Sequence, residues 1–256
     1  MGNIICIANS KGGVGKTTTA VNIAACFALF EKKTLLVDCD PQGSATTVMG
    51  IDKKKINADL YNVFVKQEKL QNIILNTALD FLHIIPTKFS LLNAETKMFS
   101  NPGKKQILKN LLKAIANEYE YIIIDSPPSL GFLTISAIVA SDWIIIPLQY
   151  QIVSLEATGQ LLMSIKKIKA IMHSNCKIAG ILLSMCNGYD EISKTITSCI
   201  TEKFHHNVFT NTIPLDNKIR NSFNMGKPLV LYDIMSKGAK SYLDLSMELI
   251  DFFEGS

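Results

Sequence analysis

Short apolar segments alternate with longer segments of helical periodicity along most of the chain. Several of the short segments are apolar at successive positions, which is typical of strands covered on both faces of a parallel sheet. The predicted strands are Ile4–Ala8, Thr34–Val37, Phe81–Ile85, Tyr121–Ile124, Trp143–Pro147, Ile178–Ser184 and Val208–Ile213, and the predicted helices are Thr17–Phe30, Gln106–Ala116, Leu155–Met172, Glu191–Lys203 and Ala239–Phe253. This alternation predicts an α/β fold with a doubly wound, mainly parallel sheet flanked by helices, which binds ligands at the carboxyl ends of its strands.

The length of the chain fits one domain. Its 256 residues are an ordinary size for a single α/β domain, so we expect residues 1–256 to form one unit. Residues 51–75 are the most polar and irregular part, and they include the run Lys53-Lys54-Lys55. We expect this segment to be a solvated surface insertion.

The composition narrows the class of protein. Hydrophobic residues make up 48% of the chain and charged residues 19%, so a large core can form and general disorder is excluded. The net charge of +4 permits a nucleic-acid partner but does not by itself indicate one. The cysteines include no C-x-x-C pair, which favours reduced, buried thiols over disulfides or a metal site; they are Cys6, Cys26, Cys39, Cys176, Cys186 and Cys199.

Neither a secretory signal nor a membrane span is expected. The first apolar stretch leads directly into a glycine-rich loop rather than into a cleavage site. No apolar run approaches the roughly 18 residues that a membrane span requires. We therefore expect a cytoplasmic protein.

The segment NSKGGVGKTTTA, residues 9–20, joins the first predicted strand to the first predicted helix. It fits a phosphate-binding loop except at two positions. Ser10 stands where the strict pattern G-x-x-x-x-G-K-[ST] has glycine, and Lys11 adds a second lysine. Gly12, Gly13 and Gly15 lack side chains, so backbone N–H groups can point at phosphate oxygens, and the helix amino terminus adds a favourable field.

Lys16 and Thr17 complete this loop. We expect Lys16 to reach the β- and γ-phosphates of a nucleotide and the Thr17 hydroxyl to ligate Mg²⁺. A glycine turn that binds nothing is the alternative, but GG-x-GKT between a strand and a helix is a far more specific signal. The loop therefore predicts a single-domain P-loop nucleoside triphosphatase.

Two carboxylates close the second predicted strand. In the segment LLVDCDPQGSAT, residues 35–46, Asp38 and Asp40 end an apolar run at the sheet edge where the glycine loop also lies. Their spacing points both side chains to the same side if the strand persists through Asp40. Such a pair suits water-mediated Mg²⁺ contacts and the orientation of an attacking water. The alternative is a polar strand end followed by a turn.

A third carboxylate follows the strand in YIIIDSPPS, residues 121–129. Four mainly apolar positions and then Asp125 form a Walker B pattern, whose carboxylate holds the metal, usually through water. Pro127 and Pro128 cannot continue the strand ladder, so the chain must turn there. The three segments together predict one site for a magnesium nucleotide.

The segments KGGVGKTT, LLVDCDPQGSAT and IIIDSPPSLG, in this order, resemble the ParA branch of the ParA/MinD deviant Walker A ATPases. Residues 144–162 and 213–245 agree with this resemblance, which therefore covers nearly the whole chain. Many ParA-like members lack the first glycine of the strict pattern, so Ser10 is consistent with the family. The resemblance implies that Lys11 is the signature lysine, which reaches across a dimer interface to the nucleotide bound by the partner subunit.

The resemblance also implies the other roles in the site. Asp40 positions the hydrolytic water, Asp125 is the Walker B carboxylate, and Asp38 and Thr18 support Mg²⁺ and phosphate. Pro214 lies against the adenine. The implied catalytic residues are Lys11, Lys16 and Asp40, the implied metal residues are Thr17, Asp38 and Asp125, and the implied nucleotide-binding residues are Lys11, Gly12, Gly13, Val14, Gly15, Lys16, Thr17, Thr18 and Pro214. The implied cofactors are ATP and Mg²⁺.

ParA-like proteins form a homodimer on ATP binding and then bind DNA without sequence preference, so the resemblance implies nonspecific DNA and a ParB-like centromere-binding protein as partners, with association with the nucleoid. Phosphate contacts add up over the doubled basic surface of a dimer. The candidate DNA-binding residues are Lys218, Arg220, Lys237 and Lys240, with Lys194 and Lys203 as weaker candidates. The chain departs from the family near 187–191, where Tyr189 stands in place of an arginine that many relatives carry.

A membrane partner is not expected. A membrane-binding member would end in an amphipathic helix with a basic face, whereas SYLDLSMELIDFFEGS carries four acidic and no basic residues. We expect this helix to pack on the sheet through Leu243, Met247, Ile250 and Phe253.

The favoured interpretation is an ATP-dependent switch that segregates DNA and hydrolyses ATP to ADP and phosphate when a ParB-like partner stimulates it. One alternative is a ParA-like ATPase that positions another cellular cargo, which one sequence cannot distinguish. A third class is an ATP-dependent ligase of small molecules or a metal-cluster carrier. The carrier would need a paired-cysteine motif that the chain lacks, and no substrate pocket for a ligase is identifiable from the sequence.

Overall fold

The structure is a computed structural model that describes residues 2–98, 102–149, 155–186 and 208–255, together with residues 195, 198, 199 and 202. The strands are β1 (Asn3–Ile7), β2 (Thr34–Asp38), β3 (Leu75–Asn76), β4 (Leu82–Ile85), β5 (Tyr121–Asp125), β6 (Trp143–Gln149), β7 (Lys177–Cys186) and β8 (Ile213–Pro214). The α-helices are α1 (Lys16–Leu29), α2 (Ser44–Val48), α3 (Leu60–Lys66), α4 (Leu92–Met98), α5 (Ile107–Ile115), α6 (Phe132–Ala140), α7 (Leu155–Met172), α9 (Asn217–Asn224), α10 (Leu229–Tyr232) and α11 (Lys237–Glu254), and short 3₁₀ turns span Leu70–Ile73, Phe89–Leu91 and Pro102–Gln106.

Within the described residues, the strands form one sheet in the order β3-β4-β2-β5-β1-β6-β7-β8. All neighbouring pairs are parallel except β3 with β4. The predicted doubly wound α/β fold is confirmed. Because β1, β2 and β5 are adjacent and parallel, the segments that follow them meet at one edge of the sheet, where ligands bind in open α/β folds.

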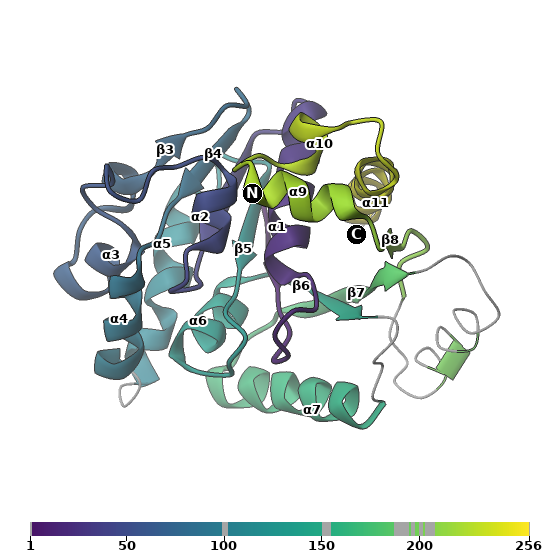
Figure 1. Cartoon of the computed structure of the whole chain (residues 1–256). Coiled ribbons are helices and arrows are strands. Elements are labelled where there is room, and N and C mark those ends of the chain that lie inside the picture. Colours follow the sequence, from purple (N-terminus) through teal and green to yellow (C-terminus); the bar gives the residue numbers. More distant parts are fainter. Residues whose placement is uncertain are drawn as a thin grey trace.

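Helices cover both faces of this sheet (Figure 1). Strand residues alternate between two buried clusters, as the period of two requires. Ile4 and Cys6 of β1 face a cluster formed with α3 to α7, whereas Ile5 and Ile7 face a cluster formed with α1, α2, α9, α10 and α11. The central strands are therefore apolar on both sides, which explains their lack of polar alternation.

Several predicted elements differ from the structure. The predicted strand Val208–Ile213 is wrong: Val208 forms an isolated bridge to Ile181, and a turn separates it from the short strand β8. The backbone N–H groups of Thr210 and Asn211 donate to the Glu248 carboxylate instead of to a neighbouring strand. Most of the predicted helix 191–203 lies outside the described residues.

Residues 51–75 pack more closely than a solvated insertion would. Asp59 and Asn62 form a capping box at the start of α3. Apolar side chains of this segment are buried in the same cluster as α4 to α6; they are Leu60, Val63, Phe64, Leu70 and Ile73. Lys54 and Lys55 are exposed, so the polar surface of this segment covers an apolar inner side.

The carboxyl-terminal helix α11 packs on the sheet and α1, but through a different face from the one predicted. Tyr242, Leu245 and Leu249 are buried together with Phe253, whereas Met247 is 56% exposed. Leu243 and Ile250 are only partly buried. Among the described helices, none combines the length and hydrophobicity needed to cross a membrane.

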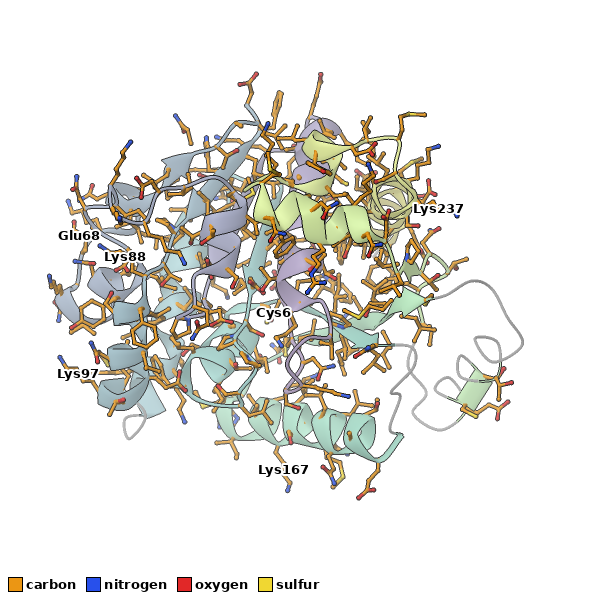
Figure 2. The ribbon with its side chains drawn as sticks, viewed as in Figure 1. Cys6, Glu68, Lys88, Lys97, Lys167 and Lys237 are labelled. Carbon is orange, nitrogen blue, oxygen red and sulfur yellow. The ribbon has the colours of Figure 1, made fainter. Side chains whose placement is uncertain are left out.

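The cysteines are unpaired thiols, as predicted. Cys6 lies inside the sheet, whereas Lys167 and Lys237 lie at the periphery of the molecule (Figure 2). Burial raises the pKa of the Cys26 thiol to about 12. Such thiols stay protonated and act as small apolar side chains.

Candidate functional site

The glycine loop between β1 and α1 is open on its outer side. Gly13 and Gly15 have φ values of 76° and 93°, which side chains of L-residues rarely adopt. A Cβ atom added at Gly12 or Gly13 would meet no atom within 4 Å. Asn9 anchors the start of the loop, because its Nδ2 donates to the Pro147 carbonyl at 2.7 Å. The loop therefore has a fixed base and room for an anion in front of it.

The two lysines of the loop differ in environment. Lys16 is buried, and its Nζ donates to the Lys11 carbonyl at 2.9 Å. Burial lowers the pKa of Lys16, while the charges of Asp125 and Asp40 act in the opposite direction. Lys11 is exposed. Among the described residues, no hydrogen bond or ion pair holds its ammonium, so it is available to a group outside the subunit.

Asp38 ends β2 in a buried position and is held by its neighbours. Its Oδ2 accepts from the Thr46 backbone N–H at 2.7 Å and from the Thr46 hydroxyl at 2.6 Å. Its Oδ1 accepts from the Asp40 N–H at 3.2 Å. Burial raises the pKa of Asp38 to about 6, with the hydrogen bonds from Thr46 opposing the shift. Asp38 is thus already satisfied by protein groups.

Asp125 ends the neighbouring strand β5, and its carboxylate is unsatisfied. Both oxygens are buried, and neither has a hydrogen-bond partner of good geometry within the described residues. Burial and the charge of Asp38 raise its pKa well above the ordinary value, and the nearby Thr17 hydroxyl only partly offsets this. A buried carboxylate without a partner is costly, so a cation or a water held by a cation fits this position.

Asp40 lies in a turn rather than on a strand. Because β2 ends at Asp38, the expectation that a continuing strand points both carboxylates to one side does not hold. Asp40 is partly exposed, and its Oδ1 accepts from the Gln42 N–H at 2.9 Å. Lys53 braces the same turn, since its Nζ donates to the Gln42 carbonyl at 2.6 Å.

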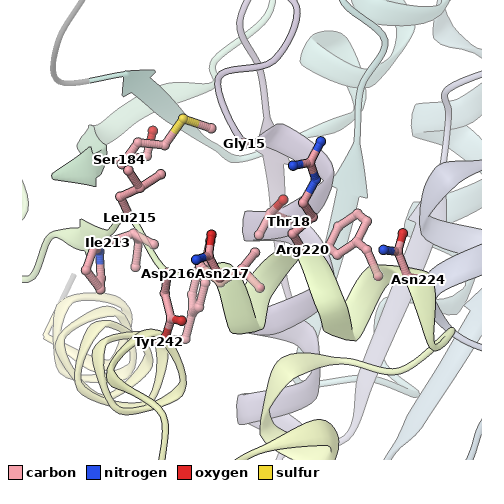
Figure 3. A pocket seen from close by; sticks show the side chains of 14 residues that line it. Gly15, Thr18, Ser184, Ile213, Leu215, Asp216, Asn217, Arg220, Asn224 and Tyr242 are labelled. Carbon is pink, nitrogen blue, oxygen red and sulfur yellow. The ribbon is translucent and has the colours of Figure 1, made fainter. Parts of the chain in front are cut away.

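Two cavities meet at the glycine loop. The smaller, of about 230 Å³, is lined by the loop, by Asp40 and by Pro128. The larger, of about 410 Å³, extends from Gly15 past Pro214 to Tyr242 (Figure 3). Gly15, Thr18 and Met185 line both. The joined space is polar at the loop end and more apolar at the Pro214 end, as a nucleotide requires.

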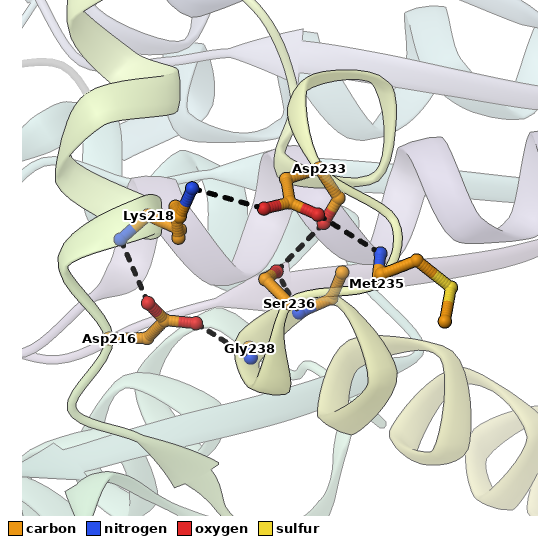
Figure 4. Close-up of polar contacts among 7 residues, drawn as sticks. Asp216, Lys218, Asp233, Met235, Ser236 and Gly238 are labelled. Atoms are coloured by element: carbon orange, nitrogen blue, oxygen red, sulfur yellow. Dashed lines mark hydrogen bonds and ion pairs between the residues drawn. The ribbon is translucent and has the colours of Figure 1, made fainter.

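The larger cavity also contains residues that the sequence did not indicate. Asp216 accepts from the N–H of Lys218 at 2.8 Å and from the N–H of Gly238 at 3.0 Å, so it caps the starts of both α9 and α11 (Figure 4). An aspartate followed by a helical pattern is an N-cap signal that could have identified the first of these contacts. The second joins residues that are distant in sequence.

The candidate DNA-binding residues separate into two environments. Lys218 forms an ion pair with Asp233 at 3.3 Å, and Arg220 lines the larger cavity. Lys237 and Lys240 are exposed in the first turn of α11. The weaker candidates Lys194 and Lys203, and Tyr189, which replaces the family arginine, lie outside the described residues.

The described residues offer few ligands for a metal at this site. Within the described part of the chain, no three His, Cys, Asp or Glu side chains are grouped to hold a metal ion. The Thr17 hydroxyl and the Asp125 carboxylate are few, hard oxygen donors, which suits Mg²⁺ held mainly by phosphate and water.

Comparisons with known proteins agree with this arrangement. A family model described as an AAA domain matches residues 2–178. The chain is 40% identical over 250 residues to the chromosome partitioning protein ParA of Myxococcus xanthus, covering 98% of this chain and 88% of that protein. It is 39% identical over 249 residues to the sporulation initiation inhibitor protein Soj of Bacillus subtilis, covering 97% and 98%. A solved structure of cobyrinic acid a,c-diamide synthase from Mycobacterium smegmatis, with bound ATP analog and magnesium, superposes with a TM-score of 0.86 at 26% identity, covering 99% of this chain and 96% of that one.

Proposed function

The chain belongs to the ParA/MinD family of P-loop ATPases, and we propose that it is an ATP-dependent switch that segregates DNA. Its cofactors are ATP and Mg²⁺. The observation that carries the proposal is that the site combines a buried Asp125, whose oxygens lack a hydrogen-bond partner among the described residues, with an exposed Lys11 in the glycine loop. The Asp125 carboxylate is stabilised by a cation inside the subunit, and the Lys11 ammonium can bind an anion of a second subunit.

In this proposal, ATP occupies the two joined cavities. The loop from Lys11 to Thr18 cradles the phosphates, and Pro214 lies against the adenine at the apolar end. Thr17 and Asp125 are the residues that would hold Mg²⁺, which would supply positive charge to the phosphates of ATP. Asp38, whose oxygens Thr46 and the Asp40 N–H already engage, supports the metal indirectly by fixing this strand end.

The catalytic steps follow from the same groups. Lys16 offsets the charge that develops on the transferred phosphate, a contribution that is large where water is excluded. Asp40, which lines the smaller cavity, orients the attacking water. Lys11 of each subunit reaches the nucleotide of the other, so that two facing triphosphates are neutralised only when both sites hold ATP.

The dimer then gains affinity for DNA because its two basic surfaces contact phosphates together. Lys237 and Lys240 are the candidates exposed on α11. Lys218 contributes less to DNA binding because its ammonium already pairs with Asp233. Stimulated hydrolysis, triggered by a ParB-like partner, releases the DNA. In the cell, the DNA-bound state of this cycle is associated with the nucleoid.

Retention of nonspecific duplex DNA with ATP, with ADP and without nucleotide tests the proposal, with each measurement repeated at two salt concentrations. We expect retention with ATP alone, weakening steeply as salt rises. Lys16→Ala should abolish the ATP-dependent part. Equal retention in all three nucleotide states would contradict a nucleotide switch.

A small-molecule ligase is the competing proposal. Its support is the likeness to the synthase structure at 26% identity, whereas the partitioning relatives are 39% and 40% identical over nearly the whole chain. DNA segregation is therefore the function that we favour.

A further inference from the structure

Arg220 lies on α9 with its side chain directed into the larger cavity. Figure 3 shows it projecting from α9 toward the start of α1, where Gly15 and Thr18 lie. These two residues also line the smaller cavity beside Asp40. Arg220 therefore lines the larger cavity together with the two residues that both cavities share.

The charge of Arg220 is not compensated within the described residues. The acidic side chain lining the same cavity is Asp216, and its two oxygens already accept from the backbone N–H groups of Lys218 and Gly238. No ion pair joins Arg220 to another described residue. Arg220 is thus an exposed cation, unpaired among the described residues, that can contact an anion bound in the cavity.

Lys218, on the same helix, provides a contrast. Its ammonium pairs with Asp233, which lies just after α10 (Figure 4). The two basic residues of α9 therefore have different contacts. Lys218 links α9 to the segment before α11, and Arg220 turns to the cavity.

We propose that Arg220 is a nucleotide-binding residue that contacts the phosphate nearest the ribose. This inference rests on the proposed nucleotide site and deepens it. A P-loop cradles the α- and β-phosphates with its backbone and the helix start, so the α-phosphate comes closest to the junction at Gly15 and Thr18. An arginine matches phosphate geometry with two parallel N–H donors.

This contact has a structural consequence. A nucleotide held by both the glycine loop and Arg220 joins α1 to α9, two elements far apart in sequence. α9 packs against α10, and Asp216 ties its start to that of α11, which carries Lys237 and Lys240. Nucleotide binding can then change the position of the start of α11, which carries the candidate DNA-binding lysines.

Calorimetric titration with ADP tests the assignment, using the full chain and the variants Arg220→Ala, Arg220→Lys and Lys227→Ala. Lys227 is an exposed lysine just after α9, so its variant removes one positive charge nearby without touching the cavity. We expect Arg220→Ala to weaken ADP binding about tenfold to a hundredfold, as loss of a charged hydrogen bond does. Arg220→Lys should be intermediate, and Lys227→Ala should match the wild type.

Each other outcome has a defined meaning. If Arg220→Ala binds ADP like the wild type, the assignment is overturned, and loss of DNA retention in that variant would then place Arg220 on a DNA surface. If the wild type itself binds no ADP, the proposed nucleotide site fails as a whole. Thermal melting without nucleotide checks folding, and an exposed side chain such as Arg220 should leave the midpoint unchanged.

Discussion

Asp38 and Asp125 are register partners at the carboxyl ends of the adjacent parallel strands β2 and β5. Both are fully buried, but only Asp38 is satisfied by hydrogen bonds. The fold thus brings two carboxylates together beside the phosphate loop and leaves Asp125 without a hydrogen bond of good geometry among the described residues. This arrangement costs stability in the empty protein and gains from a bound cation.

The first prediction concerns the pH dependence of stability without nucleotide or metal. Burial raises the pKa of Asp38 to about 6 and holds that of Asp125 well above its ordinary value, so the native state retains protons that the unfolded chain releases above pH ~4. Stability that the protonated pair contributes is therefore lost as pH rises through about 6. Urea unfolding in EDTA at several pH values should show this decline, and Asp125→Asn should flatten it. An unchanged slope in Asp125→Asn would exclude Asp125 as its source.

Thr46 joins Asp38 to the segment after β4. Its hydroxyl donates to Asp38 at 2.6 Å and accepts from the Thr87 N–H at 3.0 Å, and it is fully buried. Thr46→Val should destabilise the protein by about 1–3 kcal/mol because it leaves buried polar groups unpaired. Thr47→Val is the matched control, since Thr47 is exposed and its hydroxyl bonds only to the Gly43 carbonyl. Equal unfolding midpoints for the two variants would show that the Thr46 contacts contribute little.

Gly43 occupies a position that excludes a side chain. Its φ is 62°, and an added Cβ would lie 2.7 Å from the Lys53 side chain and 2.8 Å from the Thr87 carbonyl. Gly43→Ala should cost about 1–3 kcal/mol of stability, because the backbone is strained for alanine and Thr87 cannot withdraw. Gly12→Ala has open space around it and should leave the denaturation midpoint unchanged while weakening nucleotide binding. A Gly43→Ala protein as stable as the wild type would contradict the packing of this turn.

Lys53 should influence hydrolysis through the Asp40 turn. The Gln42 carbonyl accepts from the Lys53 ammonium, and the Gln42 N–H donates to the Asp40 carboxylate. Removing the ammonium therefore loosens the Gln42 backbone that orients Asp40. Lys53→Met should lower kcat severalfold with little change in the KM for ATP, because a mispositioned catalytic group acts on the transition state. Lys54→Met, at an exposed neighbour, should change neither. A change confined to KM would instead assign Lys53 to binding.

The phosphate loop and the strand ends that carry Asp38 and Asp125 could be predicted from the sequence, because they depend on local patterns. Apolar runs predict central strands, and parallel strands bring their carboxyl ends together. Helix α6 is mainly apolar and even its Thr134 and Ser136 are buried, so it has no exposed polar face from which a helical period could be recognised. The predicted buried face of α11 differs from the observed one because polar residues of this helix, such as Ser246, are buried.

Other parts of the site could not be predicted, because they depend on pairs distant in sequence. Glu248 replaces a strand partner for Thr210 and Asn211, and nothing near 208–213 signals it. Asp216 reaches Gly238, where a side chain would collide with Leu229. The direction of Arg220 likewise depends on the packing of α9 against α2 and α10.

The central claim is that ATP joins two copies of this chain through Lys11. Sedimentation equilibrium of Asp40→Ala with saturating ATP and Mg²⁺ tests it most directly, because slow hydrolysis preserves the ATP-bound state. We predict a dimer for Asp40→Ala and a monomer when Lys11→Ala is added, with nucleotide binding largely retained in both. A monomeric Asp40→Ala protein with ATP bound would contradict the account.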